Sequence, residues 1–307
     1  MFSTPIGAAR LFLATVITLI VLKMVVGVIT GSISIWAQLA DSSLDLLAAI
    51  ITFITVGISA KPADEEHPFG HGKMEDIAAA IQAVLLLGAA GSISYAAINR
   101  IIVGSTIQLT EAGIGVMLFS MVVSILLAHH LFRVARTTGS VALEANAHNM
   151  TGDIYSTAGV MVGLVVVRFT GLTIIDPIFA LIVALLILEM AYRVARMAIS
   201  GLLDARLPKA EEDEIISCIK EHTSQLAGFH EVRTRKSGSQ RFIDFHMMLP
   251  KNTSVEEAHK MCDHLEEDMK NRLPNSNITI HVEPCNVECD QCLISSCSLR
   301  VDIQFSR

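Results

Sequence analysis

Carboxylates occur inside two long apolar stretches of the chain, where a charge is costly. Asp41 and Asp45 interrupt the stretch 34–58, and Asp153 interrupts the stretch 147–167. Inserting such a charge at the centre of a bilayer costs about 2.5–3.5 kcal/mol on insertion scales. An ionisable residue at that depth is therefore a candidate for function rather than for stability.

The spacing of these residues makes them a possible ligand set. Asp41 and Asp45 are four residues apart, so on a helix they share one face at about 5–6 Å. Asn149 precedes Asp153 by the same interval, which adds an amide oxygen and a second carboxylate. Like charges this close repel unless a cation lies between them or one is protonated. The four residues predict a divalent-cation site; a buried proton relay and a purely structural pair are the alternatives.

A loop rich in Pro and Gly, between the second and third apolar stretches, carries a second compact set of ligand types. Asp64, His67 and His71 fall within the short run 62–73. Imidazole nitrogens and a carboxylate are ordinary zinc ligands. The loop predicts a metal site of modest affinity, and the alternative is a solvated loop that only caps the neighbouring helices.

Six apolar stretches are long enough to cross a bilayer, so we expect an α-helical membrane protein with six transmembrane helices. They are residues 9–30, 34–58, 77–99, 112–132, 147–167 and 172–192. Lys and Arg near their ends gather on one side: Arg10, Lys61, Lys73, Arg133, Arg136, Arg193 and Arg196. Only Arg100 and Arg168 mark the other side, which predicts that both termini are cytoplasmic.

Charge and motif content exclude other classes of function. The formal net charge is −7 and no basic stripe is present, so nucleic-acid binding has no support. The apolar stretches contain neither an H-E-x-x-H motif nor paired Glu-x-x-His motifs, so we expect no enzyme and no organic cofactor.

The chain becomes polar from about residue 206. The pattern of this polar part predicts a small α+β domain. Its expected elements are a helix at 208–226, strands at 229–236 and 240–249, a helix at 254–272 and a strand at 277–283. Ser254 followed three residues later by Glu257 has the pattern of a capping box at the start of the second helix. The order αββαβ predicts a two-layer domain.

Four histidines of this domain fall at the beginnings or ends of predicted elements: His230, His246, His259 and His281. Together with Glu283 they are candidate ligands for a borderline cation such as Zn²⁺. A single histidine in such a domain is more often an ordinary surface residue.

The end of the chain carries cysteines of undetermined role: Cys285, Cys289, Cys292 and Cys297. In a reducing cytosol they are thiols rather than disulfides. One CxxC without a second is a weak metal signal, so a thiolate site and free thiols both stay open.

The order of these motifs resembles the cation diffusion facilitator family. The resemblance covers roughly residues 8–285 and rests on Asp41-x3-Asp45, on Asn149-x3-Asp153 and on the run His67-Pro-Phe-Gly-His71-Gly-Lys73. The αββαβ domain is similar to that family's metallochaperone-like cytoplasmic domain. The resemblance implies a transmembrane transport domain at 1–205, a cytoplasmic metal-binding and dimerisation domain at 206–290, and a cysteine-containing tail at 291–307.

The same resemblance implies a function and assigns the candidate ligands to it. It implies a homodimer in the cell (inner) membrane that exports divalent cations such as zinc, manganese or iron(II) in exchange for protons. Asp41, Asp45, Asn149 and Asp153 match the transport site, and the loop ligands match a second site. The histidines and Glu283 match cytoplasmic sites at the dimer interface. Zinc-type members usually place His where Asn149 stands, which leaves the metal open. A membrane metal sensor or store without flux is the alternative function.

Overall fold

The computed structural model describes residues 3–30, 33–103, 111–170, 172, 174–222 and 226–285. Asp41 lies on a described helix, but its side chain is outside the described part, as are Cys289, Cys292 and Cys297. Internal contacts divide the chain into two compact units, residues 1–202 and 203–307. Each unit is built on its own hydrophobic core.

The first unit consists of long helices. They are α1 (Pro5–Thr30), α2 (Ile33–Ser59), α3 (Met74–Val103), α4 (Glu111–Thr138), α5 (Val141–Thr170) and α6 (Ile175–Leu202). All six are long and apolar enough to cross a membrane, as predicted. Most run past the predicted apolar stretches because their buried face continues: on α6, Val194 and Ala198 are still fully buried beyond residue 192.

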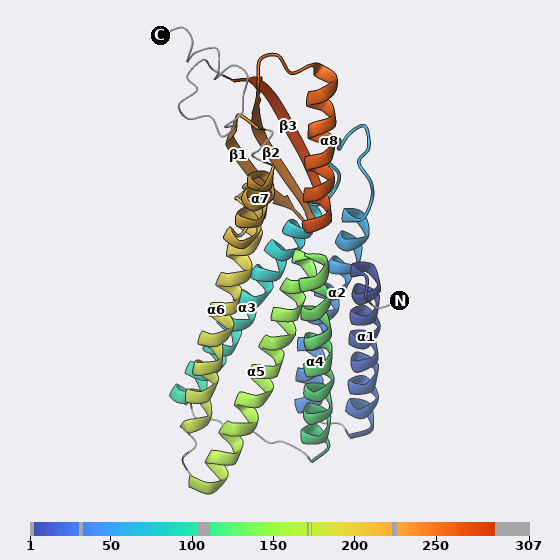
Figure 1. The fold of residues 1–307 in the computed structure, drawn as a ribbon. Coiled ribbons are helices and arrows are strands. Elements are labelled where there is room, and N and C mark those ends of the chain that lie inside the picture. Colours follow the sequence, from blue (N-terminus) through green and yellow to red (C-terminus); the bar gives the residue numbers. More distant parts are fainter. Residues whose placement is uncertain are drawn as a thin grey trace. The chain divides into compact units, whose positions relative to one another are not determined.

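The helix α5 stands at the centre of this unit. Its residues Leu143, Ala147 and Met150 belong to a core shared with α1, α2 and α4. Its residues Val141 and Ala145 belong to a second core shared with α3 and α6, which lie side by side (Figure 1). The helix that carries Asn149 and Asp153 is thus held from both sides.

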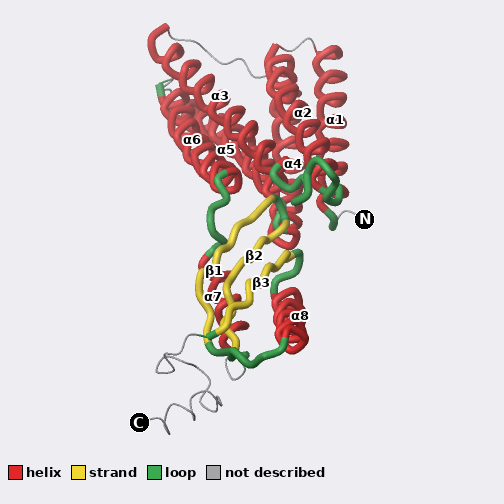
Figure 2. The backbone as a smooth tube through the Cα atoms, turned by 90° about the horizontal axis from the view of Figure 1, so that it is seen from above, coloured by secondary structure: helices red, strands yellow, loops and turns green. Residues whose placement is uncertain are grey.

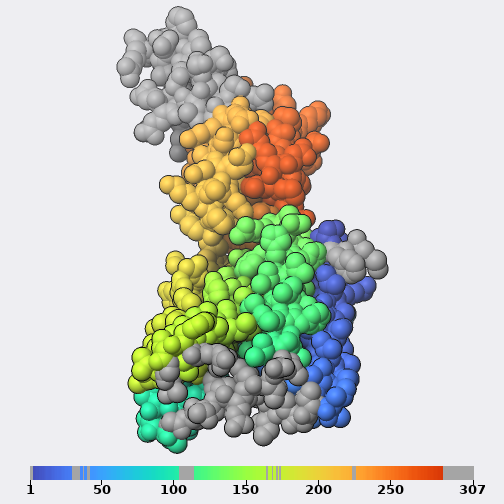
Figure 3. All heavy atoms as spheres, turned by 90° about the horizontal axis from the view of Figure 1, so that it is seen from below, coloured from blue at the N-terminus to red at the C-terminus, as the bar shows by residue number. Residues whose placement is uncertain are grey.

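The outer surface of this unit is apolar. Large exposed side chains occur along the helices, among them Val28, Leu126 and Leu185. The surfaces of α4 and α5 adjoin one another in the space-filling view (Figure 3). An apolar surface of this extent is what contact with lipid tails requires.

The second unit has the predicted order αββαβ. Its elements are α7 (Lys209–Glu221), β1 (Gly228–Ser237), β2 (Gln240–Leu249), α8 (Val255–Arg272) and β3 (Ser276–Pro284). The sheet order is β1-β2-β3, with β1 antiparallel and β3 parallel to β2 (Figure 2). The β1–β2 turn contains Gly238 at φ 58°, a backbone conformation that glycine adopts without strain.

Two element ends test the sequence prediction of this unit. The capping box is present as predicted: Ser254 Oγ accepts from the backbone N–H of Glu257, whose carboxylate accepts from the backbone N–H of Ser254. The first helix was predicted to reach residue 226, but α7 ends at Glu221 with His222 as its C-cap. Leu226 continues the apolar spacing of this helix in the sequence, which made the predicted helix too long. In the structure Leu226 is buried, but it lies beyond the end of the helix.

The strand β2 separates a covered face of the sheet from an open one. Alternate residues pack with α7 and α8 in the core of the unit: Ile243, Phe245, Met247 and Leu249. Since side chains alternate along a strand, His246 points to the opposite face. One face of the sheet is therefore packed against the helices, and the other carries His246.

Candidate metal centres

Polar side chains of α2 and α5 meet inside the first unit. Nδ2 of Asn149 donates a hydrogen bond to Oδ1 of Asp45 at 3.1 Å. Asp45 and Asp153 line a cavity of about 220 Å³, and together with Asn149 they line a neighbouring cavity of about 130 Å³. The structure thus brings together three of the four predicted ligands. Asp41 is on α2, one turn before Asp45.

The larger cavity is lined by further polar groups. Nζ of Lys23, on α1, donates to Oγ of Ser42 on α2 at 2.7 Å, and both residues are buried. Ser120 on α4 lines the same cavity, and its buried Oγ has no hydrogen-bond partner among the described residues. A cavity with carboxylates and hydroxyls in its wall can replace part of the hydration shell of an ion.

A fully buried polar network holds α2, α3 and α5 together beside these ligands. Nε2 of Gln82 donates to Oδ1 of Asn146 at 2.9 Å and to the carbonyl oxygen of Ala48 at 3.3 Å. Nδ2 of Asn146 donates to Oγ1 of Thr52. Asn146 stands one turn before Asn149, so the network fixes α5 against α2 at the level of the ligands. Sequence reasoning missed it because single amides in apolar helices have no diagnostic spacing.

The loop between α2 and α3 brings its three predicted ligands together. Asp64 Oδ1 accepts from the backbone N–H of His67 at 2.7 Å and lies 3.2 Å from Nδ1 of the same residue. Asp64 Oδ2 lies 3.3 Å from Nε2 of His71. Gly70, at φ 79°, makes the turn that returns His71 toward Asp64. One ligand atom from each side chain lies within 4.8 Å of the others.

The electrostatics of this loop favour an ionised carboxylate. The backbone hydrogen bond from His67, helped by the nearby imidazoles, holds the pKa of Asp64 below its usual range. Nδ1 of His71 is buried and has no hydrogen-bond partner in the described part of the chain. An ionised oxygen and two imidazoles in one small loop match the ligand types of a zinc site.

The open face of the sheet carries a row of histidines. Strand register places His230 opposite His246 and His246 opposite His281, one residue from each strand. Neighbouring ring centroids are 5.1 Å and 4.7 Å apart. A bulge between His230 and Arg233, with Glu231 at φ 51°, interrupts the ladder beside the row. Such bulges re-aim side chains at functional sites.

Glu283 completes this cluster. Its Oε1 lies 2.9 Å from Nδ1 of His246 and its Oε2 lies 3.5 Å from Nε2 of His230. His281 is adjacent, with Nε2 at 3.6 Å from Oε1 of Glu283. The fifth predicted ligand, His259, is not part of this cluster within the chain: it is exposed on α8, and its Nε2 lies 3.7 Å from Asp263. Cys285, just past β3, is half-buried with a free thiol.

The second unit also contains a group of ligand types that sequence reasoning did not assign. His222, His264 and Asp268 lie within 4.8 Å of one another by their ligand atoms. The interval from His264 to Asp268 is a signal in the sequence, since residues four apart share a helix face. His222 is on another helix and had no local signal.

Two family profiles match the chain. The cation efflux transmembrane domain matches residues 9–203, and the cytoplasmic domain of cation efflux proteins matches residues 207–285. An uncharacterized transporter of Synechocystis sp. is 32% identical over 263 residues, which are 86% of this chain and 85% of the relative. The cation-efflux pump FieF of Salmonella paratyphi A is 34% identical over 269 residues, 88% and 89% of the two chains.

Two solved structures are similar to about a quarter of this chain. The zinc form of CzrB is 36% identical and covers 26% of this chain and 90% of its own, with a TM-score of 0.25. The metal-bound C-terminal domain of the CzcD transporter from Thermotoga maritima is 28% identical and covers 27% of this chain and all of its own, also with a TM-score of 0.25.

Proposed function

Because this chain belongs to the cation diffusion facilitator family of metal transporters, we propose that it exports divalent cations from the cytoplasm in exchange for protons. It is an integral membrane transporter and not an enzyme. The observation that carries the proposal is the convergence of Asp45, Asn149 and Asp153 on two adjoining cavities of the membrane unit.

The proposed exchange follows from the chemistry of the ligands. A cation that enters from the cytoplasm displaces protons from the carboxylates, since a carboxylate must be deprotonated to bind metal. Protons that rebind from the far side then release the cation. Asp45 and Asp153 line the same cavity, so one cation bound there could replace protons on both carboxylates. In the metal-bound state the amide of Asn149 turns its oxygen toward the ion.

The metal carried is proposed to depend on Asn149. Three carboxylates and an amide form an all-oxygen site, which suits harder ions such as Mn²⁺ and Fe²⁺ better than a site with an imidazole does. Zinc still stands above both in the general affinity order, so carboxylates alone retain it. The donor set therefore admits all three ions, and position 149 sets their ranking.

The loop site and the sheet site are proposed to bind regulatory metal on the cytoplasmic side. We propose a homodimer in the cell (inner) membrane with both termini in the cytoplasm, in line with the distribution of Lys and Arg near the ends of the apolar stretches. Filling the cluster of His230, His246, His281 and Glu283 favours one arrangement of the dimer, because a ligand shifts an equilibrium by its differential affinity for the two states. His259 is proposed to join this cluster from the second protomer.

Metal-stimulated proton flux in proteoliposomes, measured across a panel of divalent ions, tests the proposal. We expect flux with wild type and its loss with Asp153→Asn. Glu189→Gln is the matched control, since Glu189 is an exposed α6 carboxylate paired with Arg193 and away from the cavity. A protein that binds metal but moves neither metal nor protons would be the sensor or store instead.

A further inference from the structure

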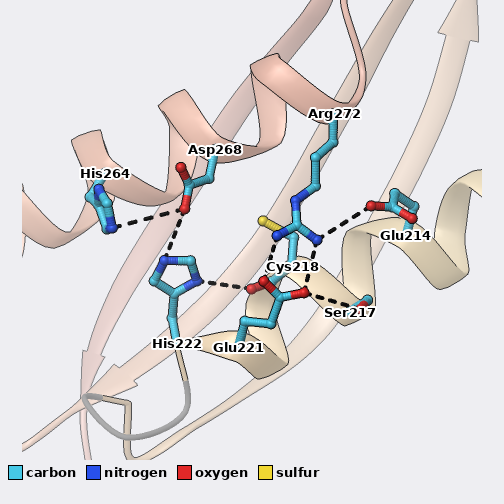
Figure 4. Close-up of polar contacts among 8 residues, drawn as sticks. All are labelled: Glu214, Ser217, Cys218, Glu221, His222, His264, Asp268 and Arg272. Carbon is cyan, nitrogen blue, oxygen red and sulfur yellow. Dashed lines mark hydrogen bonds and ion pairs between the residues drawn. The ribbon is translucent and has the colours of Figure 1, made fainter.

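A third cluster of ligand-type side chains lies between α7 and α8, apart from the histidine row on the sheet. His222 caps the C-terminal end of α7, while His264 and Asp268 are one turn apart on α8 (Figure 4). The two helices cover the face of the sheet opposite to His246. The cluster is therefore independent of the sites assigned above.

The distances in this cluster match the coordination geometry of a small cation. Nε2 of His222 lies 3.1 Å and Nε2 of His264 lies 3.9 Å from the same atom, Oδ2 of Asp268. The two rings meet edge to face with centroids 5.0 Å apart. Ligands at about 2.0–2.1 Å from a tetrahedral Zn²⁺ are separated from one another by roughly 3.3 Å. The His222 separation of 3.1 Å is close to that value, and the three ligand atoms lie within 4.8 Å of one another.

A hydrogen bond from the ring of His222 to the backbone fixes which of its two nitrogens has a free lone pair. Nδ1 lies 2.9 Å from the carbonyl oxygen of Cys218. A carbonyl oxygen can only accept, so Nδ1 carries the hydrogen and donates it. In a neutral imidazole Nε2 then presents a lone pair. A backbone carbonyl that fixes the tautomer in this way is the usual support of a metal-binding histidine.

This tautomer makes the cluster repulsive without a cation. The lone pair of His222 Nε2 faces an oxygen of Asp268 at 3.1 Å, so two acceptors oppose each other. Either a second proton on the imidazole or a metal ion resolves the contact. His264 brings a second imidazole nitrogen within 3.9 Å of the same oxygen, so one metal ion between the three atoms would have all of them as ligands.

The surroundings hold the ligands in place without competing for the ion. The side chain of His222 is only 12% exposed. Cys218 supports His222 through its carbonyl oxygen, and its side chain is fully buried in the core of the unit. Arg272 on α8 bonds both Glu221 and Glu214 on α7, which ties the two helices together one turn beyond Asp268 (Figure 4).

We propose that His222, His264 and Asp268 form a structural site for a borderline divalent cation, with Zn²⁺ the best match, inside a single protomer. Two imidazoles and a carboxylate are a common zinc donor set, and water takes the fourth position. The bound ion clamps the end of α7 onto α8. Its effect is to stabilise the cytoplasmic domain by mass action, whether or not the membrane unit transports metal.

The helix α8 provides its own control. Glu267 precedes Asp268 on this helix and is exposed. It belongs to none of the three-ligand clusters found among the described residues, and it is not a ligand of any site proposed above. Asp268→Asn and Glu267→Gln thus each remove one carboxylate charge from α8, and only the first removes a proposed ligand.

The test is the zinc content of the full-length protein in detergent after equilibrium dialysis, measured by elemental analysis. We expect Asp268→Asn to retain one zinc per chain fewer than wild type, and Glu267→Gln to retain as much as wild type. Equal zinc in the two variants would overturn the site. If Asp268→Asn fails to fold, the exposed His264→Asn takes its place with the same expected loss. Proteoliposome flux of either variant stays at the wild-type rate, so loss of this zinc and failure of export are distinguishable.

Discussion

Replacing Asn146 by Leu is expected to weaken both the membrane unit and transport, although Asn146 touches no proposed ligand. Leu has the same number and branching of side-chain heavy atoms as Asn, but it is larger and cannot hydrogen-bond. It removes the acceptor of Gln82 and the donor to Thr52. All three side chains are fully buried, so water cannot replace the lost partners. Gln82 keeps only its longer bond, 3.3 Å, to the carbonyl of Ala48.

The magnitude follows from the number of bonds broken between helices. Interhelical hydrogen bonds in membrane proteins contribute about 0.6 kcal/mol on average and at most about 1.7 kcal/mol. Two lost bonds therefore cost about 1–3 kcal/mol. If this free energy is lost entirely from the metal-binding arrangement of α2 and α5, the apparent metal affinity falls by about 5- to 150-fold.

The assay combines thermal unfolding in detergent with flux in proteoliposomes. Asn146→Leu should unfold at a lower temperature than wild type and need a higher metal concentration for half-maximal flux. Asn99→Leu is the control, because Asn99 is an exposed amide on α3. If Asn146→Leu transports with unchanged metal dependence, the network does not position the ligands and the reasoning fails.

Three further predictions concern the other parts of the chain. Asn149→His should move transport preference toward zinc and away from manganese, and an unchanged metal ranking in competition assays would show that position 149 does not select. His246→Asn should reduce the zinc-induced rise in unfolding temperature, since it removes the central member of the histidine row; an equal rise would leave the row without metal. The Arg241 hydrogen bonds lower the pKa of Glu211 in the folded state, so their stabilisation is full above the unfolded pKa near 4.3 and is lost as pH falls through the lower folded value. Acid unfolding should accordingly be less steep in Glu211→Gln than in wild type, and superimposable curves would contradict this.

Local patterns were enough to predict most of the fold. The apolar stretches gave the six helices, because burial in lipid demands long uninterrupted apolar segments. The capping box at Ser254 marked the start of α8, since both of its hydrogen bonds join residues three apart. The predicted end of α7 at residue 226 was wrong. Leu226 continues the apolar spacing of the helix in the sequence, but its burial comes from the tertiary fold.

The candidate sites with a local sequence pattern were likewise predicted, and those that depend on tertiary contacts were not. The ligands of the loop site lie within one short segment, and the spacing of Asn149 and Asp153 is a helix repeat, so the sequence alone suggested both. The α7–α8 cluster depends on contacts of His222 with two residues of α8, His264 and Asp268, that are more than forty positions away in the chain. The Gln82–Asn146 network likewise depends on packing between helices. Within one element the first leaves only the His264–Asp268 interval as a signal, and the second leaves none.

The alanines between α3 and α6 have a consequence for assembly in the bilayer. Ala79, Ala83 and Ala90 of α3 are buried against α6. Alanine has no side-chain rotamers to lose when it is buried, so the α3 side of this contact forms without that entropic cost. Lipid supplies no hydrophobic drive for helices to associate, and close van der Waals contact must replace it. The contact between α3 and α6 thus joins helices that are not neighbours in the chain through close backbone approach, and α5 packs on the same core.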